Sequence, residues 1–365
     1  MSVFLHALET AVPRHSYPQS FARDLMKSWS DDRKTQRLLH AVFNRSGIET
    51  RHSVSGDFVE GEEAQLFRTD ETGKLVSPTT QDRNDLYATE SRRLAVELGR
   101  KLLASAEGIE ASDVTHVVFA SCTGFCNPGP DYYLVRDLGL PDSTERYILG
   151  FMGCYAAFPA LRMAKQFCEA DPDAVVLVMC LELCSLHLQP SNEPDTLLAN
   201  SLFADGAGAA LVSARKPAEG SHGFRFENFV SALVPAGEAD MAWDIGNHGF
   251  NIVLSSYVPE ILGAQVEGLL GEVLEKAGIS LAEIDEWAVH PGGRAILDKV
   301  AEGLDLPSET MDVPREILRR YGNMSSATIL FVLKEMLARS TEPSQTLAMA
   351  FGPGLTVETA LLERY

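Results

Sequence analysis

The stretch LGRKLLASAEGIEASDVTHVVFASCTG at residues 98–124 decides the fold, because a similar stretch, LLGEVLEKAGISLAEIDEWAVHPGG, follows at residues 269–293. Each is typical of a helix, then Gly-Ile, a polar connection, and a strand that ends in a glycine-containing loop. Self-similarity of this kind indicates a duplicated structural unit. Chance similarity is the alternative, since helix–strand units are common.

The similarity continues beyond these two stretches. In the same alignment, MGCYAAFPALRMAKQF at residues 152–167 corresponds to YGNMSSATILFVLKEM at residues 321–336. Each of these stretches precedes an acidic loop and a predicted strand. Gly108 precedes Cys154 by 46 positions, and Gly278 precedes Asn323 by 45. We therefore predict an α/β fold of two duplicated halves, residues 1–215 and 216–365, divided near the polar stretch SARKPAEGSHG at residues 213–223.

Composition limits the classes of protein that this chain can belong to. Its 365 residues are 45% hydrophobic and 22% charged, which is ordinary for a globular protein. The formal net charge of -20 argues against a general nucleic-acid surface and against binding to anionic membranes. Runs such as AVVLVMCLELCSL at residues 174–186 are too short to span a bilayer, so we expect no membrane insertion.

The N-terminal region contains no basic segment followed by an apolar one, so no secretory signal is evident. We therefore expect a cytoplasmic protein whose six cysteines are reduced thiols. Residues 20–95 are polar and have few periodic apolar positions, so this region is predicted to be rich in loops.

Cys154 is the first candidate for a reactive group. It follows a glycine at the start of an apolar helix, where unpaired N–H groups and a partial positive charge favour a thiolate over a thiol. The thiolate is the nucleophilic form of cysteine. A buried cysteine is also commonly a small hydrophobic residue of the core, and that alternative stays open for Cys154 taken alone.

His290 and Asn323 strengthen the case for chemistry. His290 is predicted to end a strand in the second copy, and Asn323 holds the helix start equivalent to that of Cys154. Either residue alone has a structural explanation, as a turn residue or as a helix N-cap. Together, however, a histidine can activate a thiol, and histidine and amide N–H groups can stabilise a negative oxygen.

The remaining cysteines raise the question of a metal site. Cys122, Cys126, Cys180 and Cys184 form two C-x-x-x-C pairs, whereas structural zinc sites usually use tighter spacings. Cys180 and Cys184 fall within a predicted apolar strand, on the same face. We therefore expect these residues in the core or lining a cavity, and no bound metal. Cys168 is expected to pack its helix against the core.

Several motifs carry a resemblance to a known family. MGCYAA, VHPGGRAILDKV, YGNMSSATILFVLKEM and the closing FGPGLTVETALL resemble the signatures of type III polyketide synthases, the chalcone and stilbene synthase family, of bacterial type. The resemblance covers most of the chain, including PGPDYYLVRDLGL and SLFADGAGAALV. It implies a five-layered αβαβα thiolase fold that forms homodimers, with no cofactor other than the CoA thioesters that serve as substrates.

The resemblance also implies a mechanism. Cys154 would accept an acyl group from a CoA starter, while His290 and Asn323 would stabilise the enolate that forms when malonyl-CoA loses carbon dioxide. The enolate would attack the Cys154 thioester, and repeated extension would give a polyketide that cyclises. The motifs leave the starter, the number of extensions and the mode of cyclisation open.

Cavity residues follow from the same resemblance. Phe203 matches an aromatic gatekeeper between the CoA tunnel and the catalytic cavity, whereas Ile252 stands where the family has a second phenylalanine. This difference predicts a wider or differently shaped cavity. Other positions expected to line it are Cys122, Thr123, Cys184, His187 and Ser325. A long or bulky aliphatic starter and an alkylpyrone or alkylresorcinol/resorcylic-type product are favoured by Ile252, Cys122, Cys184 and His187 and by the bacterial character of ELCSLH.

For CoA binding, only Arg45 matches the basic residues of the family. Arg37 and Arg51 are candidates to supply charge in place of the others that are missing.

Three further functions stay open at this point. They are an aromatic-product synthase of the chalcone or stilbene type, a thiolase-fold condensing enzyme that uses a carrier protein, and a Cys-His-Asn hydrolase. A binding protein without catalytic activity is a fourth possibility, which retention of all three residues argues against.

Overall fold

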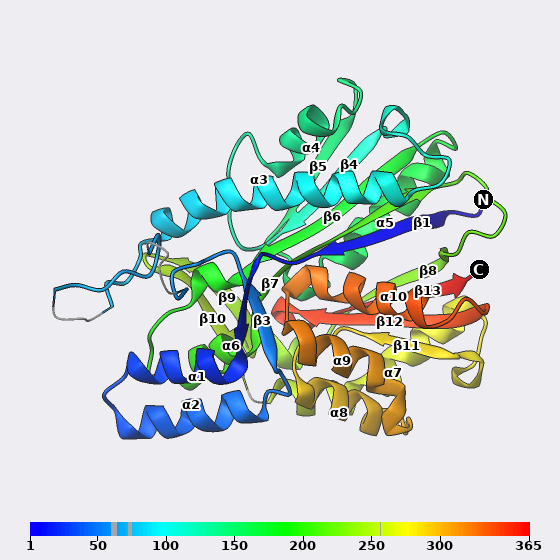
Figure 1. Ribbon diagram of the computed structural model, residues 1–365. Helices are drawn as coiled ribbons and strands as arrows, with labels where there is room; N and C mark the ends of the chain where they lie inside the picture. The colour runs from blue at the N-terminus through cyan, green and yellow to red at the C-terminus, as the bar shows by residue number, and fades with distance from the viewer. Residues whose placement is uncertain (60–63, 72–74, 256) are drawn as a thin grey trace.

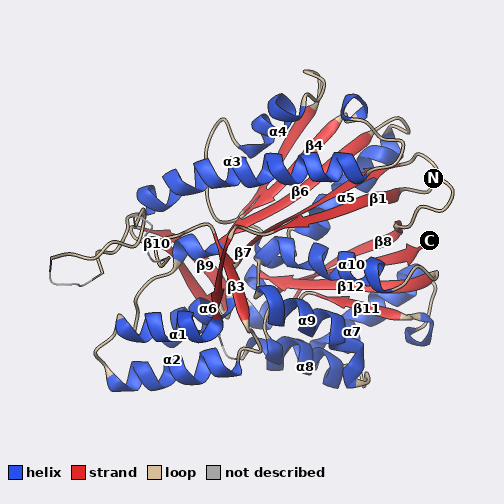
Figure 2. Ribbon diagram, viewed as in Figure 1, coloured by secondary structure: helices blue, strands red, loops and turns tan. Residues whose placement is uncertain are grey.

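The computed structural model describes residues 1–59, 64–71, 75–255 and 257–365. Its centre is a nine-stranded sheet with the order β11-β12-β13-β8-β1-β7-β6-β4-β5 (Figures 1 and 2). The strands of the first half are β1 (Phe4–Ala11), β4 (His116–Ser121), β5 (Glu145–Gly150), β6 (Val175–Leu183) and β7 (Asp205–Ser213). Those of the second half are β8 (Phe224–Leu233), β11 (Glu286–Val289), β12 (Ser344–Gly352) and β13 (Thr356–Arg364).

This strand order is symmetric about the β8–β1 pair. Outward from that pair, β1-β7-β6-β4 corresponds to β8-β13-β12-β11, with antiparallel pairing except for the parallel β6–β4 and β12–β11 pairs. The two half-sheets join where β1 meets β8, at the register pairs Phe4–Arg225 and Leu5–Phe224, and the backbone N–H of Phe226 donates to the carbonyl of Val3. The topology therefore confirms the predicted duplication.

Helices cover both half-sheets and fill the space between them. The helices of this framework are α3 (Thr80–Ser105), α4 (Pro130–Leu138), α5 (Ala157–Ala170), α7 (Val258–Ala277), α8 (Arg294–Gly303), α9 (Asp312–Tyr321) and α10 (Thr328–Arg339). In Figure 1, α5 and α10 lie between the half-sheets, α3 and α4 cover the first half-sheet, and α7 and α8 cover the second. This is the predicted five-layered αβαβα arrangement.

Three apolar clusters correspond to these layers. The central cluster contains α5 and α10 residues such as Phe158 and Leu330, and a second joins α3 to the first half-sheet. The third joins α7 and α8 to the second half-sheet, as at Leu262 and Leu297. Cys168 of α5 and Cys180 of β6 are buried in the central cluster, as expected for packing residues.

The N-terminal region differs from its prediction. Two amphipathic helices, α1 (Gln19–Ser28) and α2 (Arg33–Arg45), lie side by side where loops were expected. Their apolar contacts are made by a few widely spaced residues, Met26, Leu39 and Phe43, and the other positions are mostly polar. The amphipathic pattern was therefore present in the sequence, and the high content of polar residues concealed it.

Smaller elements complete the fold around α2. They are the antiparallel pair β2 (His15–Pro18) and β3 (Thr50–Ser53), helix α6 (Pro194–Leu202), and a separate two-stranded sheet of β9 (Met241–Gly246) and β10 (Gly249–Leu254). No helix within the described residues is long and apolar enough to cross a membrane.

Candidate active site

Cys154 lies in a short 3₁₀ turn, Gly153–Tyr155, that leads into α5. Gly153 has φ 77°, a left-handed conformation that glycine adopts without strain. A β-carbon at Gly153 would lie 2.3 Å from Cδ of Pro353, so the turn also packs too closely for a side chain. Glycine at this position therefore sets the place of the cysteine.

Asn323 lies in the corresponding turn of the second half. It follows Gly322, which has φ 74°, and precedes the 3₁₀ turn Ser325–Ala327 and helix α10. The side-chain oxygen of Asn323 accepts a hydrogen bond from the backbone N–H of Ser325 at 2.8 Å. Its amide nitrogen donates to the carbonyl of Gly292 at 3.1 Å, so the amide has a fixed orientation.

The two turns bring the thiol and the amide together. Sγ of Cys154 lies 3.9 Å from both Oδ1 and Nδ2 of Asn323, although the residues are 169 positions apart. His290 follows β11 directly, and its imidazole lines the same cavity. Both ring nitrogens of His290 are buried without a hydrogen-bond partner in the described structure, which leaves them available for a substrate.

Burial controls the ionisation of this group. It raises the pKa of the Cys154 thiol to about 11, while hydrogen bonds from Ser325 and Asn323 act in the opposite direction. Burial also lowers the pKa of His290 to about 3. Desolvation therefore outweighs the stabilisation of a thiolate that the sequence predicts at the helix start, and the thiol of the free chain keeps its proton.

The cavity at this site has a volume of about 360 Å³ and opens between α2, α6, α7 and the β9–β10 sheet. Its lining includes Cys154, His290 and Asn323, together with Phe203, Ile252 and Arg45. The remaining lining is mostly apolar, as at Leu202 and Val258. The structure thus brings the three predicted catalytic side chains into one space with the predicted gatekeeper.

A second, inner cavity of about 30 Å³ lies behind the first. Four predicted positions line it: Cys122, Thr123, Cys184 and His187. Phe203, Ile252 and Trp243 line both cavities. Trp243, the cross-strand partner of Ile252 in the β9–β10 sheet, lines the same region, and the expectation that Ile252 makes the cavity wider or differently shaped stays a prediction.

Hydrogen bonds hold the inner wall in place. The backbone N–H of Phe250 donates to Nδ1 of His187, so Nε2 carries the proton and donates to the carbonyl of Thr123 at 2.8 Å. Burial lowers the pKa of His187 to about 4, so this histidine is neutral. Cys184 begins a 3₁₀ turn, Cys184–His187, directly after β6 rather than lying within the strand as predicted.

Cys122 and Glu182 support the reactive turns from behind. Sγ of Cys122 accepts a hydrogen bond from the backbone N–H of Gly153 at 3.0 Å. Glu182, which sequence reasoning missed, accepts hydrogen bonds from the N–H of Cys122, the hydroxyl of Thr123 and the hydroxyl of Ser326. Burial raises its pKa to about 7. Ser325 is buried beside Asn323, with φ 47°.

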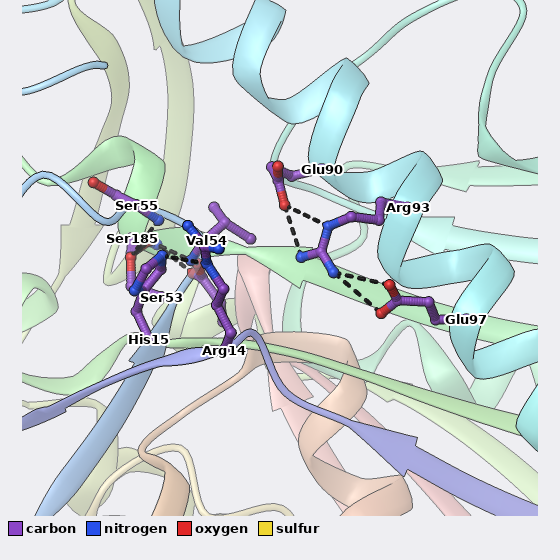
Figure 3. A network of polar contacts seen from close by, with 10 residues as sticks. Arg14, His15, Ser53, Val54, Ser55, Glu90, Arg93, Glu97 and Ser185 are labelled. Carbon is purple, nitrogen blue, oxygen red and sulfur yellow. Dashed lines mark hydrogen bonds and ion pairs between the residues drawn. The ribbon is translucent and has the colours of Figure 1, made fainter. Parts of the chain in front are cut away.

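A polar network fastens the turn of Cys184 and His187 to β3. Asp205 accepts hydrogen bonds from the backbone N–H groups of Ser185 and Val54, and the Ser185 and Ser53 hydroxyls lie 2.7 Å apart. Figure 3 shows Ser53, Val54 and Ser55 gathered with Ser185, while Arg93 on α3 is held between Glu90 and Glu97. The network fixes the inner cavity wall relative to the N-terminal segment.

The three candidate arginines have different environments. Arg45 is exposed at the end of α2 and lines the outer cavity. Arg37 is exposed on the same helix and lines neither cavity. Arg51 is buried and donates hydrogen bonds to the carbonyls of Asn200 and Phe203, so the prediction that it supplies charge to CoA is wrong.

Arg294 is a cavity residue that sequence reasoning missed. It begins α8 directly after the two glycines that follow His290, and its side chain is 64% exposed at the outer cavity. A β-carbon at Gly47 would lie 3.5 Å from Cβ of Arg294, so this arginine sits close to the C-terminal end of α2. The sequence signal was the arginine in HPGGR.

Among the described residues, no group of three or more His, Cys, Asp or Glu side chains is arranged to hold a metal ion. The two C-x-x-x-C pairs instead separate, with Cys180 in the central core and Cys122 and Cys184 at the inner cavity.

Comparison with known proteins identifies the family. Models of the N-terminal and C-terminal domains of chalcone and stilbene synthases match residues 2–216 and 226–364. The chain is 31% identical over 364 residues to the alpha-pyrone synthesis polyketide synthase-like Pks18 of Mycobacterium tuberculosis, covering 98% of this chain and 90% of that protein. It is 29% identical to probable polyketide synthase 1 of Dictyostelium discoideum, of whose length it spans only 11%.

Solved structures agree with this result. The C-terminal type III polyketide synthase domain of Steely1 from Dictyostelium has a TM-score of 0.90 and 28% identity, covering 100% of this chain and 99% of that one. The predicted thiolase-like fold is confirmed. Proteins of this family are acyltransferases that form polyketides from CoA thioesters, including malonyl-CoA. The chain belongs to the chalcone and stilbene synthase family, the type III polyketide synthases.

Proposed function

We propose that this chain loads an acyl-CoA starter on Cys154, extends it by iterative decarboxylative condensation with malonyl-CoA, and cyclises the product. The observation that carries the proposal is the shared cavity of Cys154, His290 and Asn323, with the thiol sulfur 3.9 Å from the amide. We further propose an alkylpyrone or alkylresorcinol/resorcylic-type product from an aliphatic starter, because the outer cavity is mostly apolar.

Loading begins with a proton transfer between two neutral groups. An isolated thiolate and an isolated imidazolium are each disfavoured by burial, but as a pair they neutralise one another. As the thiol sulfur attacks the starter carbonyl, its proton passes to His290. The C–S bond to CoA then breaks, CoA leaves as a thiol with that proton, and His290 is again neutral.

Extension uses the same polar groups as neutral donors. When malonyl-CoA loses carbon dioxide, the electron pair of the breaking C–C bond moves into the thioester and places negative charge on its oxygen. N–H groups of His290 and Asn323 stabilise this enolate, whereas a carboxylate at either position would repel it. The enolate carbon attacks the Cys154 thioester and releases the thiolate, which leaves the extended chain as a CoA thioester. The thiolate then attacks that thioester, the C–S bond to CoA breaks, and CoA leaves as the chain returns to Cys154.

Arginines at the cavity mouth support the binding of CoA. Arg45 and Arg294 are both exposed, and guanidinium groups hold phosphate oxygens through paired hydrogen bonds. We propose these two residues as the phosphate-binding pair, with Arg294 in place of the candidates Arg37 and Arg51. The homodimer, the cytoplasmic location and the domain boundary at residues 215 and 216 stay predictions.

Product analysis tests the function. The chain is incubated with malonyl-CoA and a panel of fatty acyl-CoA and aromatic acyl-CoA starters, and products are identified by mass spectrometry. We expect pyrones or resorcinols from fatty acyl starters and no extension by Cys154→Ala. Turnover of aromatic starters alone would remove the aliphatic assignment. Hydrolysis of the starter without release of carbon dioxide from malonyl-CoA would instead indicate a hydrolase.

A further inference from the structure

The exposed face of α2 is positively charged. Helix α2 contains no acidic residue, and its exposed residues are Arg33, Lys34, Arg37, His40, Asn44 and Arg45. The lysine and the three arginines in this set make no ion pair with any described residue, whereas arginines on other surface helices do, as Arg93 does with Glu97. A local basic surface therefore lies on a chain whose formal net charge is -20.

This basic face is longer than the mouth of the outer cavity. Arg45, at the C-terminal end of α2, lines that cavity, and with Arg294 it supplies guanidinium groups for the phosphates of CoA. Arg33, Lys34 and Arg37 do not line the cavity. The face from Arg33 to Arg45 spans about 18 Å at 1.5 Å per residue. It continues along the outside of the molecule (Figure 1), so its charge fits a larger anionic partner than CoA.

Another side of the same mouth is apolar and exposed. Val253 of β10 lines the outer cavity and is 40% exposed. Tyr257, which lies between the lining residues Ser255 and Val258, is 69% exposed. Exposed apolar side chains that gather beside charged ones are typical of surfaces that contact another protein, whereas a phosphate group gains nothing from them. The mouth therefore fits an acidic protein.

We propose that the basic face of α2 docks an acidic carrier protein, which delivers the starter as a thioester on a phosphopantetheine arm. CoA contains the same arm, so thioesters from both sources enter by the same mouth. The net charge of -20 repels an acidic partner from the rest of the surface, and the face of α2 therefore directs it to the mouth. This inference rests on the proposed function and adds a partner for its loading step.

Loading from the carrier protein follows the same chemistry as loading from CoA. The sulfur of Cys154 attacks the thioester carbonyl while its proton passes to His290. The C–S bond to the arm then breaks, and the sulfur of the arm leaves as a thiol with that proton. The acyl group stays on Cys154, and the carrier protein dissociates with a free thiol.

Loading of Cys154 from three octanoyl thioesters tests this inference. The octanoyl group is supplied on the acyl-carrier protein of bacterial fatty-acid synthesis, on CoA and on uncharged pantetheine, and kcat/KM for acylation is measured by mass spectrometry. The variant Arg33→Glu/Lys34→Glu/Arg37→Glu reverses the charge of the face. We expect it to lower kcat/KM for the carrier protein about 10–100-fold, within the range over which complementary charge changes association rates.

The other two thioesters show whether the effect belongs to the carrier protein. Loading from pantetheine should stay within about twofold of the wild-type value, since this substrate carries no charge. Loading from CoA should fall less than loading from the carrier protein, because Arg45 and Arg294 remain at the mouth. If the reversed variant does not fold, Arg33→Gln/Arg37→Gln replaces it, with the same criteria.

The variant Arg100→Glu/Lys216→Glu/Lys276→Glu is the matched control. It changes the net charge by the same amount, at exposed positions that line neither cavity. We expect it to load from the carrier protein at about the wild-type rate, because the contacts of the docking face are intact. An equal loss in the control and the reversed variant would show that net charge, and not the face of α2, governs loading, and would overturn the inference.

Three further results would also overturn it. A face that belongs to the CoA site would give equal losses for CoA and the carrier protein in the reversed variant. A face that binds a membrane would bind vesicles of phosphatidylglycerol, and the carrier protein would then load the wild-type chain no faster than pantetheine does. Loading from the carrier protein that the reversal leaves unchanged is the third. Absence of loading from all three thioesters would instead contradict the proposed function.

Discussion

The turn before α5 and the turn before α10 occupy equivalent places in the two halves but carry different chemistry. Each contains a left-handed glycine, Gly153 or Gly322, followed by the reactive residue and a long buried helix. One turn presents the thiol of Cys154 and the other the amide of Asn323. Duplication thus supplies the same backbone geometry twice, and side-chain divergence assigns a different role to each copy.

The equivalent strands β6 and β12, whose ends lie next to these turns, also carry different residues in the two halves. Glu182 at the end of β6 accepts a hydrogen bond from Ser326, close to Asn323 in the opposite half. Gly352 at the end of β12 lies against the turn of Cys154, where a β-carbon would be 2.5 Å from the ring of Tyr155. Each half therefore supports the reactive turn of the other, one through a carboxyl group and one through the absence of a side chain.

The largest expected effect separates the roles of the two turns. We expect Asn323→Ala to lower malonyl-CoA decarboxylation by about 10²–10³-fold, the usual effect of losing one donor to a developing oxyanion. Cys154→Gln should instead abolish extension but retain decarboxylation, because His290 and Asn323 remain. Release of carbon dioxide from malonyl-CoA measures both. Equal losses of decarboxylation in the two variants would contradict a division of roles.

A second prediction concerns the glycine that positions Cys154. Gly153→Ala places a methyl group 2.3 Å from Pro353 and should lower product formation about 100-fold, because misplacing a reacting group by about 1 Å has effects of that size. Gly139→Ala is the matched control: Gly139 also has a left-handed φ, 69°, with no atom within 4 Å of the added carbon.

The control variant should lose about 1–2 kcal/mol of stability from its backbone conformation but keep its activity. Thermal unfolding and product formation are measured for both variants. Equal activity of the two proteins would show that close packing at Gly153 does not position the thiol.

The smallest effect concerns Glu182. Its pKa is raised to about 7 in the folded chain, above the ordinary 4.5, so the folded state binds a proton more readily than the unfolded state. Its contribution to the free energy of unfolding should therefore decrease as the pH rises from about 4.5 to 7, by about 1–3 kcal/mol. Glu182→Gln should remove this part of the pH dependence. Urea unfolding at pH 5 and pH 8 measures it, and parallel pH profiles would contradict the assignment.

Much of the fold could be predicted because duplication repeats its signals. The glycine spacing before Cys154 and Asn323 identified equivalent turns, and the strand order shows the symmetry that this spacing implied. Helices α1 and α2 escaped prediction, since their burial rests on a few residues. Both helices are strongly amphipathic, so their apolar stripes were readable, and the polar composition of the region outweighed that signal.

The site was predictable where motifs carry it and not where it depends on contacts distant in sequence. Arg51 binds backbone carbonyls inside the protein instead of a phosphate group, and these carbonyls come from residues about 150 positions further along the chain. No residue near Arg51 in the sequence indicates these contacts. Trp243 lines both cavities beside Ile252, its partner on the neighbouring strand, and this pairing depends on how β9 and β10 meet. Burial raises the pKa of Cys154, and burial depends on the whole fold rather than on the helix start alone.

Acylation in the absence of malonyl-CoA tests the central claim most directly. The wild-type chain and Asn323→Ala are each mixed with octanoyl-CoA, quenched in acid, digested and analysed by mass spectrometry. We predict one octanoyl group on the peptide that contains Cys154 in both proteins, because loading requires the first turn and decarboxylation the second. Acylation of a different cysteine, or none in Asn323→Ala, would contradict the division of work between the two turns.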